Sequence, residues 1–463
     1  MAAKLKQSGR EDFIILEQAK ALGGTWRDNT YPGAECDIPS ALYSFSFFPN
    51  PTWDFKWAKQ PQILRYMQDF SKSFDIDPHI RFGVTVMAAT YDEQGQRWSI
   101  KTSDGQIYTA QFLVSAVGQL HHPRWPEIKG REDFAGANFH SARWDHSVDL
   151  AGQSVGVIGN AASAVQLIPE IAKVAGELTV YQRSPNWIID KMDRPYSRLE
   201  KWLARWVPGL AKFYRFQLWS LGEYFLWPMI QGSRLHSRLG VMQCKKAIRT
   251  HIQDKTLRRA LVPDYPIGAK RVLLSDTYYP ALARENVTLE RRQISHITKT
   301  GVKLEEGDLH RHDVLIYATG FHTNPFLKEI EVRGQNDVSL REHWKDGAFA
   351  YLSVMTSDFP NLFLLYGPNS NTGHTSIIFK LENQVNYCLQ LMDRADKKSV
   401  SVKAESEAAF NDTVQSTLKD LMWSKVEASW YKDGARVTNN WPWSSRTFKR
   451  RLRRPNWAHF KIG

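Results

Sequence analysis

The stretch Ser154-Val155-Gly156-Val157-Ile158-Gly159-Asn160-Ala161-Ala162-Ser163-Ala164 decides the fold of this chain. Its apolar beginning predicts a buried strand, and a helical pattern follows from Ala161 to Ala175. Gly159 allows a tight turn, after which the helix presents free N–H groups and a positive dipole end to a pyrophosphate. The residues from Gly159 to Ala164 therefore predict a dinucleotide site, although Ala161 stands in place of the usual second glycine.

The end of the next predicted strand indicates which dinucleotide binds. Leu178-Thr179-Val180-Tyr181 is typical of a strand, and Arg183 and Ser184 follow at the place where an acid would bind the ribose 2′-hydroxyl of NAD. A guanidinium and a hydroxyl suit a 2′-phosphate instead. We therefore expect NADP(H); the alternative for Arg183 is a surface arginine after a strand.

Composition and length are those of an ordinary globular protein. The chain has 463 residues, 42% hydrophobic and 24% charged, which excludes disorder, collagen and coiled coil and predicts two or three domains. Its three cysteines form no disulfide framework and no metal-site spacing, so we expect no metal and a reducing, cytoplasmic compartment. No apolar run is long enough to span a membrane, and the first residues lack a signal-peptide core.

The positive charge is concentrated in one segment. Residues 198–259 hold thirteen Lys and Arg against three acids, which accounts for +10 of the formal net charge of +13. Nine aromatic residues are interleaved with these bases. The pattern is typical of a solvated helical face, of a lid over an apolar cavity or of docking at a membrane surface. Because no nucleic-acid-binding module accompanies the charge, no nucleic-acid partner is expected.

The N-terminal segment predicts a second dinucleotide fold. Phe13-Ile14-Ile15-Leu16-Glu17 is typical of a buried strand that ends in an acid, and Glu17 would accept hydrogen bonds from ribose hydroxyls. The glycine turn of such a fold lies about 20 residues before the acid. Only sixteen residues precede Glu17, and Met1–Ser8 has a helical pattern. Two hypotheses follow: a misassigned start, with the natural chain beginning upstream, or a non-catalytic remnant that binds NADP.

Longer motifs resemble the class B flavoprotein monooxygenases over essentially the whole chain. Gly23-Gly24-Thr25-Trp26 and the stretch Tyr31-Pro32-Gly33-Ala34-Glu35-Cys36-Asp37 resemble the flavin-binding start of that family. Residues 134–145, FAGANFHSARWD, match F-x-G-x-x-x-H-x-x-x-W-[PD], the fingerprint of type I Baeyer–Villiger monooxygenases. Residues 318–321, 367–374 and 430–441 are also similar to this family, and most of all to its 4-hydroxyacetophenone monooxygenase-like members.

The resemblance implies an FAD- and NADPH-dependent oxidoreductase. Such an enzyme uses O₂ to insert oxygen next to the carbonyl of a ketone, here a hydrophobic one, and forms an ester or lactone through a C4a-peroxyflavin. The peroxide must stay anionic, and a fixed cation excluded from water stabilises that charge. The alternative activity is oxygenation of a nitrogen or sulfur atom, which needs a protonated hydroperoxyflavin.

Particular positions match the family's functional residues. Arg271 corresponds to the catalytic cation and Asp37 to its carboxylate partner; the alternatives are a surface basic pair at Lys270-Arg271 and a turn acid. His140 would orient the linker between the domains rather than transfer a proton, and Trp430 would close over the nicotinamide or be an ordinary tryptophan. Trp26 and Tyr43 could be core aromatics. The complete set of implied cofactor contacts, besides residues 159–164, Arg183 and Ser184, is Glu17, Gly24, Thr25, Trp26, Arg27, Asp28, Cys36, Asp37, Tyr43, Val86, His140, Lys270, Arg271 and Trp430.

The predicted fold is therefore α/β, with two Rossmann-like dinucleotide-binding domains built on parallel sheets. A helical insertion interrupts the NADP-binding domain. The expected boundaries are 1–125 for the first part of the FAD-binding domain, 126–312 for the NADP-binding domain with its insertion at about 191–265, and 313–463 for the return into the FAD-binding domain and the C-terminal region.

Overall fold

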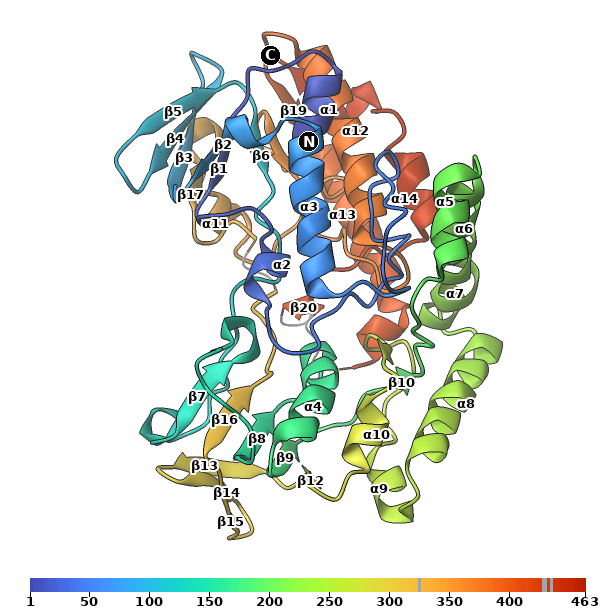
Figure 1. Ribbon diagram of the computed structural model, residues 1–463. Helices are drawn as coiled ribbons and strands as arrows, with labels where there is room; N and C mark the ends of the chain where they lie inside the picture. Colours follow the sequence, from blue (N-terminus) through green and yellow to red (C-terminus); the bar gives the residue numbers. More distant parts are fainter. Residues whose placement is uncertain (324–325, 427–430, 434–435) are drawn as a thin grey trace.

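The computed structural model describes residues 1–323, 326–426, 431–433 and 436–463, arranged as two lobes (Figure 1). The lower lobe contains a five-stranded parallel sheet of order β12-β9-β8-β16-β7. Its strands are β7 (Ala137–His140), β8 (Ser154–Ile158), β9 (Glu177–Tyr181), β12 (Val287–Glu290) and β16 (Val314–Tyr317). The predicted α/β class with parallel sheets is confirmed.

The two faces of this sheet are covered differently. Val155 and Val157 of β8 pack with helices α4 (Ala162–Val174) and α10 (Tyr278–Leu282) in one apolar cluster. Ile158 packs on the other face, against the antiparallel sheet of β13 (Ile294–Thr298), β14 (Gly301–Leu304) and β15 (Leu309–Arg311). This alternation of side chains is what buries the sheet on both sides.

Strand β16 belongs to the lower lobe. It pairs with β7 and β8, so the sheet extends beyond the expected boundary at residue 312. Directly after β16, the chain contacts the segment that precedes β7. There Arg124 donates its backbone N–H to the Gly320 carbonyl at 2.9 Å. We therefore propose that the return into the other domain begins after Tyr317 rather than at 313.

The upper lobe contains two separate parallel pairs and a mixed sheet (Figure 1). β1 (Ile15–Glu17) pairs with β2 (Ile80–Phe82), and β6 (Leu113–Ser115) pairs with β18 (Leu362–Leu364). The mixed sheet has the order β17-β3-β4-β5. Its strands are β3 (Val86–Asp92), β4 (Arg97–Thr102), β5 (Ile107–Ala110) and β17 (Glu331–Arg333).

Helices pack beside these strands and supply most of the upper core. Cys388 and Leu391 of α12 are fully buried in a cluster that also includes Val414 of α13 and Phe448 of α14. The upper-lobe helices are α1 (Ala2–Gln7), α2 (Thr25–Asp28), α3 (Gln60–Ser73), α11 (Leu340–His343), α12 (Ile377–Ala395), α13 (Ala404–Lys419) and α14 (Ser445–Arg451). The remaining short pairs are β19 (Val400–Val402) with β22 (Phe460–Ile462), and β20 (Lys432–Asp433) with β21 (Arg436–Val437).

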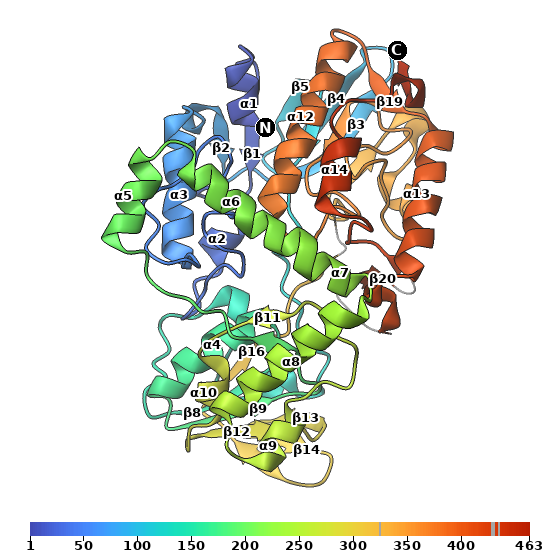
Figure 2. The ribbon, with the colours of Figure 1, turned by 90° about the vertical axis from the view of Figure 1, so that its right-hand side faces the viewer.

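The expected insertion is helical and lies along one side of both lobes (Figure 2). It consists of α5 (Arg198–Trp206), α6 (Leu210–Leu221), a π-helical turn at Gly222–Leu226, α7 (Trp227–Ile230), α8 (Arg234–His251) and α9 (Lys255–Ala260). Two short strands flank it, β10 (Ile188–Ile189) and β11 (Leu273–Leu274), which pair in parallel. No described helix is long and apolar enough to cross a membrane. All three cysteines are buried and free; the cytoplasmic location stays a prediction.

Candidate functional site

The predicted dinucleotide turn joins β8 to α4. Gly159 has φ +117°, and a Cβ there would lie 2.3 Å from the carbonyl oxygen of Ala318, so only glycine fits. Ala161 caps α4 without a side-chain hydrogen bond, which leaves the N–H groups of the first turn, at Ala162, Ser163 and Ala164, available to an anion. The turn therefore fits a pyrophosphate group in spite of the alanine at position 161.

A network of amides fixes this turn to the segment after β9. The Asn160 amide donates to Gln182 Oε1 at 2.9 Å and to the Ser184 carbonyl at 2.8 Å. The Asn186 amide donates back to the Asn160 carbonyl at 2.9 Å. Arg183, which is exposed, lies in the middle of this segment. The network holds Arg183 and Ser184 beside the turn, where the ribose of a bound dinucleotide would lie.

A second cation lies close to Arg183. Burial lowers the pKa of Lys270, and the nearby charge of Arg183 lowers this pKa further. The Lys270 ammonium also lies 4.5 Å from the centre of the Tyr265 ring. Two cations that repel each other at a nucleotide turn form a site for a divalent anion, so the pair fits a 2′-phosphate.

Arg271 and Asp37 form an ion pair although 234 positions separate them in the chain. Arg271 Nη2 donates to Asp37 Oδ1 at 2.7 Å, and the two side chains are 26% and 27% exposed. Burial works to lower the pKa of Arg271, but the Asp37 carboxylate and weaker interactions with Tyr431, Cys36 and Tyr366 together outweigh it and raise this pKa above its ordinary value. The guanidinium therefore keeps its charge at any working pH.

Two tyrosines near this ion pair were missed by sequence reasoning. Burial raises the pKa of Tyr366 to about 12, and burial likewise raises that of Tyr431; both phenols interact with the charges of Arg271 and Asp37. The Tyr366 hydroxyl donates to Asn371 Oδ1 at 3.1 Å. Tyr366 directly precedes the family-like stretch at 367–374, and that position after a buried strand was the available signal. Both phenols stay neutral, so they add no competing negative charge.

The motif at 31–37 is docked onto the nucleotide-binding helix α4. The Tyr31 hydroxyl donates to Gln166 Oε1 at 2.8 Å, and the Gln166 amide donates to the Glu35 carbonyl at 3.0 Å. Gly33 has φ +80°, and a Cβ there would lie 2.5 Å from the Gln166 carbonyl oxygen. The Glu35 carboxylate in turn pairs with Lys191, just before the insertion. These contacts explain why a glycine follows Tyr31-Pro32, and they hold Asp37 close to the lower lobe.

Glu17, Arg27 and Asp28 are brought together at the end of β1. Glu17 Oε1 accepts from the Ala19 backbone at 2.9 Å and lies 3.6 Å from Arg27 Nη1. Arg27 Nε also pairs with Asp28 Oδ1 at 2.7 Å. Gly24 (φ +48°) precedes α2, which begins at Thr25. The acid therefore lies at the predicted strand end with one oxygen already engaged by its own chain.

The other flavin-side positions lie mostly in the core. Trp26 Nε1 donates to the Tyr43 hydroxyl at 3.0 Å, and both rings pack on an apolar cluster that includes Cys36. Burial raises the pKa of the Cys36 thiol, so this cysteine is unreactive. Val86 begins β3 and packs against an apolar cluster that Leu16 also contacts.

The described N-terminal residues fit FAD only in part. Residues 1–17 contain α1 and β1 but no glycine turn between a strand and a helix. The ribose-side acid and the residues around Asp37 are present, whereas the described part of this segment offers no helix-terminus site for the FAD pyrophosphate.

His140 lies at the end of β7 and is fully buried. Its Nδ1 accepts from the Ala142 backbone N–H at 3.1 Å, and burial lowers the pKa of His140 to about 4. The neutral ring lies 6.0 Å from the Phe321 ring, at the crossover between the lobes. This geometry supports positioning of the linker rather than proton transfer. Trp430 lies outside the described residues.

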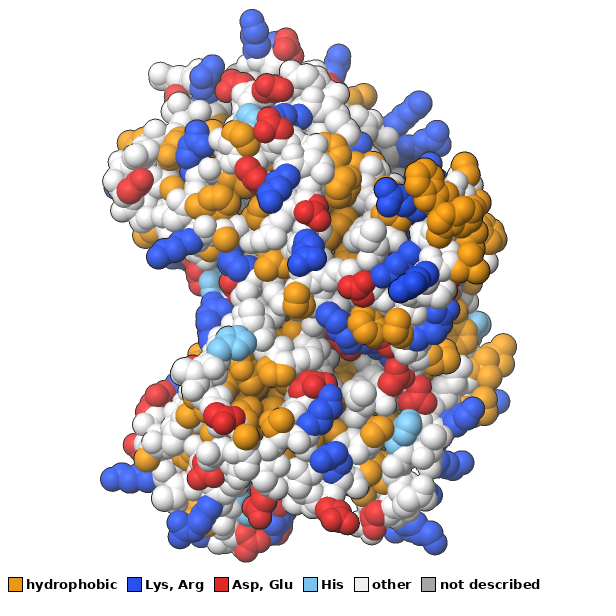
Figure 3. Space-filling view, viewed as in Figure 1, with side chains coloured by type: hydrophobic (Ala, Val, Ile, Leu, Met, Phe, Trp, Pro, Cys, Tyr) orange, Lys and Arg blue, Asp and Glu red, His pale blue; other side chains and the backbone are white. Residues whose placement is uncertain are grey.

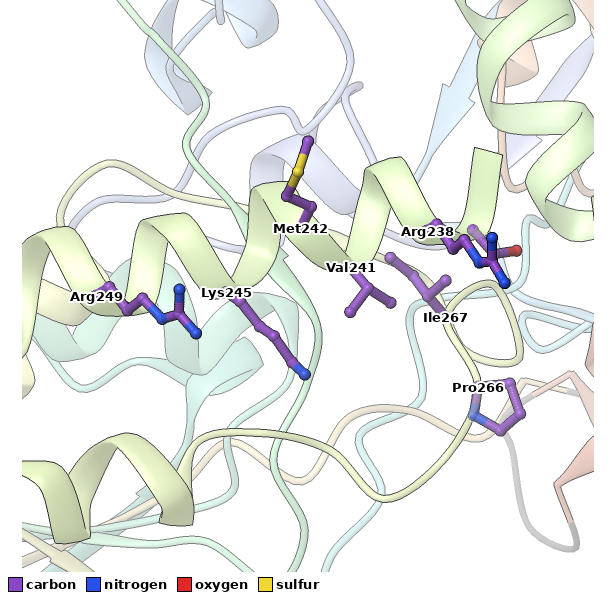
Figure 4. Close-up of a pocket in the computed structure, with 8 residues that line it drawn as sticks. Arg238, Val241, Met242, Lys245, Arg249, Pro266 and Ile267 are labelled. Atoms are coloured by element: carbon purple, nitrogen blue, oxygen red, sulfur yellow. The ribbon is translucent and has the colours of Figure 1, made fainter. Parts of the chain in front are cut away.

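Helix α7 and the segment leading to Arg271 lie side by side. A Cβ on Gly268 (φ +89°) would be 3.2 Å from the Met229 carbonyl oxygen, and Ile267 packs with Met229. On the outer side of this segment, a pocket of about 490 Å³ opens against α8 (Figure 4). Its lining includes Ser237, Arg238, Val241, Met242, Lys245, Arg249, Pro266 and Ile267.

This combination of a nucleotide turn, a cationic phosphate site and a second domain that reaches the turn defines a pyridine-nucleotide-dependent oxidoreductase. A family model described as pyridine nucleotide-disulphide oxidoreductase matches residues 1–210. The Baeyer–Villiger monooxygenase of Streptomyces coelicolor is 38% identical over an alignment of 470 residues, gaps included, which covers 100% of this chain and 90% of that protein. The Baeyer–Villiger monooxygenase of Pseudomonas aeruginosa is 38% identical over 440 residues, covering 93% of this chain and 82% of that one. The chain belongs to the Baeyer–Villiger monooxygenase family, and it is an oxidoreductase of the monooxygenase class.

Solved structures show the same architecture. A crystal structure of OTEMO in complex with FAD and NADP has a TM-score of 0.88 at 26% identity, covering 100% of this chain and 96% of that chain. The closed structure of cyclohexanone monooxygenase gives a TM-score of 0.86 with the same identity and coverage. The predicted family, enzyme class and two-domain fold are thereby confirmed.

Proposed function

We propose that this protein oxidises a hydrophobic ketone to an ester or lactone, with NADPH and O₂ as co-substrates and FAD as prosthetic group. The observation that carries the proposal is the 2.7 Å contact between Arg271 and Asp37, which joins the two lobes beside the nucleotide turn. When bound, FAD supplies the redox chemistry that passes electrons from NADPH to dioxygen. The protein's own residues hold the cofactors, exclude water and stabilise negative charge.

Arg271 is the charge-stabilising residue in this proposal. Asp37 engages Nη2, and the guanidinium carries four further N–H donors for an anionic oxygen. Electrostatic attraction at a partly buried site is several times stronger than in water. A cation fixed there before the reaction begins stabilises the negative charge that ketone addition requires.

The NADPH side rests on the dinucleotide turn and its two cations. The first turn of α4 would bind the pyrophosphate, while Arg183, Ser184 and Lys270 would hold the 2′-phosphate. The Gln166 amide of α4 donates to the carbonyl of Glu35, two residues before Asp37. A nucleotide bound at the first turn of α4 would therefore lie next to the segment that carries Asp37.

The preference for a hydrophobic ketone rests on α7 rather than on the aromatic residues of α5 and α6. Met229 and Ile230 are buried where α7 meets the segment leading to Arg271, and Trp227 of the same helix is buried in the upper-lobe cluster. Most of the aromatic residues in α5 and α6 instead face outward. An apolar wall on the α7 side favours a substrate without charge.

Replacement of Arg271 tests the proposed chemistry. The Arg271→Ala protein should lose ketone conversion, while NADPH still reduces the bound flavin in a stopped-flow experiment under nitrogen. The same variant should be assayed with a sulfide, because sulfur oxygenation uses a protonated oxidant and does not need the cation. Ester formation at an unchanged rate would refute the assigned role, and a wild-type protein that oxidises the sulfide but not the ketone would favour the heteroatom-oxygenating alternative.

The visible absorption spectrum of the purified protein tests the proposed prosthetic group. Flavin bands near stoichiometric occupancy support the monooxygenase, whereas a colourless protein that still binds NADPH would contradict it.

A further inference from the structure

We propose that the outer face of the insertion, formed by α5, α6 and α8, is a docking surface for a bilayer that contains anionic lipids. We call it the insertion face. It lies along the right-hand side of the molecule in Figure 1 and faces the viewer in Figure 2. The proposal stands independently of the chemistry at Arg271.

Large apolar side chains of the insertion face point into solvent. None of the described residues of α5 or α6 is buried, although both helices carry tryptophan and phenylalanine. Figure 3 shows these apolar side chains gathered at the right-hand edge of the molecule. The most exposed members are Leu199 64%, Trp202 56%, Trp206 61%, Phe213 56%, Phe216 58% and Leu221 59%. A contiguous patch of this kind on a protein surface marks an interaction site.

The apolar side of helix α5 faces solvent, whereas the apolar side of a core helix faces the protein interior. Leu199, Trp202 and Trp206 recur at helical spacing and share one side of α5, and that side is exposed. Ser197 and Glu200 form a complete capping box at its beginning, so the helix is well defined in this orientation. An amphipathic helix with tryptophans on an outward apolar side is typical of helices that lie in a lipid interface.

The charges around the apolar side chains indicate which kind of partner binds the insertion face. Arg198, Arg205 and Lys212 are exposed among them. The two acids between Arg198 and His251 are engaged elsewhere. Glu200 pairs with Arg194 at 2.7 Å, and Glu223 is buried, where it accepts from the Ser445 backbone at 3.0 Å. The insertion face therefore offers cations and no free carboxylate among its described residues.

This charge distribution argues against a second copy of the chain as the occupant. Two insertion faces placed together would bring the same cations into contact without any acid to pair with them, which is destabilising. Anionic lipid headgroups provide the opposite charge, and the acyl boundary beneath them accepts the tryptophans.

Helix α8 extends the cationic part of the face. Arg238, Lys245 and Arg249 line the pocket between α8 and the segment at Pro266 and Ile267 (Figure 4). Met242, on the same helix, is 61% exposed. A lipid phosphate would find three donors in this pocket while the α5–α6 side enters the interface. Because no described helix can cross a membrane, the association would be peripheral.

Vesicle flotation with the full chain tests the proposal. We expect the protein to float with phosphatidylcholine vesicles that contain phosphatidylglycerol, and to bind at least about tenfold less to pure phosphatidylcholine or at high salt. Tryptophan emission should shift to the blue on binding. Equal binding to both vesicle types, or none to either, would overturn the proposal.

Variants with matched controls identify the surface. The double variant Trp202→Ser, Trp206→Ser should lose binding about tenfold. Leu199→Ser should weaken binding, whereas Ile107→Ser should not, although these two side chains are 64% and 65% exposed. Sedimentation velocity tests whether a second copy of the chain covers the insertion face instead. If the wild type is a dimer and the double variant a monomer, a second copy covers the face and the lipid proposal is wrong.

Discussion

Replacing Asp37 by asparagine tests the ion pair with Arg271 at nearly constant shape. The change removes one negative charge that lies 2.7 Å from Nη2 and leaves the guanidinium without its counter-charge. Two unit charges about 4 Å apart attract by about 4 kcal/mol at an effective dielectric constant of about 20. Each side chain is about a quarter exposed, so water screens part of this attraction, and we take about 1–2 kcal/mol as the loss.

The loss of this attraction should lower the amount of ester formed for each NADPH consumed. Since about 1.4 kcal/mol corresponds to a factor of ten, Asp37→Asn should lower kcat/KM for the ketone about tenfold. Reduction of the flavin by NADPH should change less than about twofold, because Asp37 takes no part in the phosphate site. The assay is parallel measurement of ester by gas chromatography and of NADPH by absorbance.

A pair outside the site provides the control. Arg333 Nε and Glu331 Oε1 lie 2.8 Å apart in β17, in the mixed sheet of the upper lobe. Glu331→Gln should leave the ratio of ester formed to NADPH consumed unchanged. If Asp37→Asn leaves this ratio and kcat/KM at wild-type values, Asp37 does not position the guanidinium and the reasoning fails.

Three further expectations follow from single contacts. Arg183→Ala should raise KM for NADPH about tenfold and leave KM for NADH unchanged, as measured by steady-state kinetics. Gly33→Ala should lower the free energy of unfolding by about 1–3 kcal/mol more than Gly105→Ala. Both glycines have positive φ, but only at Gly33 would an added Cβ lie 2.5 Å from a backbone oxygen. Equal losses of stability in the two variants would contradict this clash. Burial lowers the pKa of His140 from 6.5 to about 4, so its contribution to stability is complete above pH 6.5 and is lost as the pH falls towards 4. Urea unfolding at several pH values should therefore show a shallower acid loss for His140→Asn, by at most about 3 kcal/mol.

The dinucleotide half of the molecule could be predicted from sequence because its signals are local. The apolar run before Gly159 and the helical pattern after it are fixed by neighbours in the chain, and the structure has β8 at Ser154–Ile158 and α4 at Ala162–Val174. Arg183 follows the next strand by the same local logic. Such signals survive without knowledge of the rest of the fold.

Features that depend on distant contacts were harder to predict. Strand β16 has the apolar pattern of any buried strand, and only its pairing with β7 and β8 assigns it to the lower lobe. The aromatic residues of α5 are compatible with a cavity or with an exposed face, because periodicity shows which residues share a side but not what that side contacts. Tyr366 and Tyr431 come from separate segments, and no spacing in the chain connects them to Arg271.

The position of the ion pair depends on the nucleotide-binding lobe for both of its partners. Asp37 lies two residues after Glu35, whose carbonyl accepts from Gln166 of α4 at 3.0 Å. Arg271 follows a segment whose Tyr265 carbonyl accepts from Trp187 Nε1 at 3.0 Å, shortly after the Arg183 segment. One partner is therefore held by the helix that begins at the nucleotide turn, and the other by the strand segment that holds the 2′-phosphate site. A change in either element would move one charge relative to the other, and the pair would be the first contact of the site to respond, because ionic hydrogen bonds lose energy steeply with distance and angle.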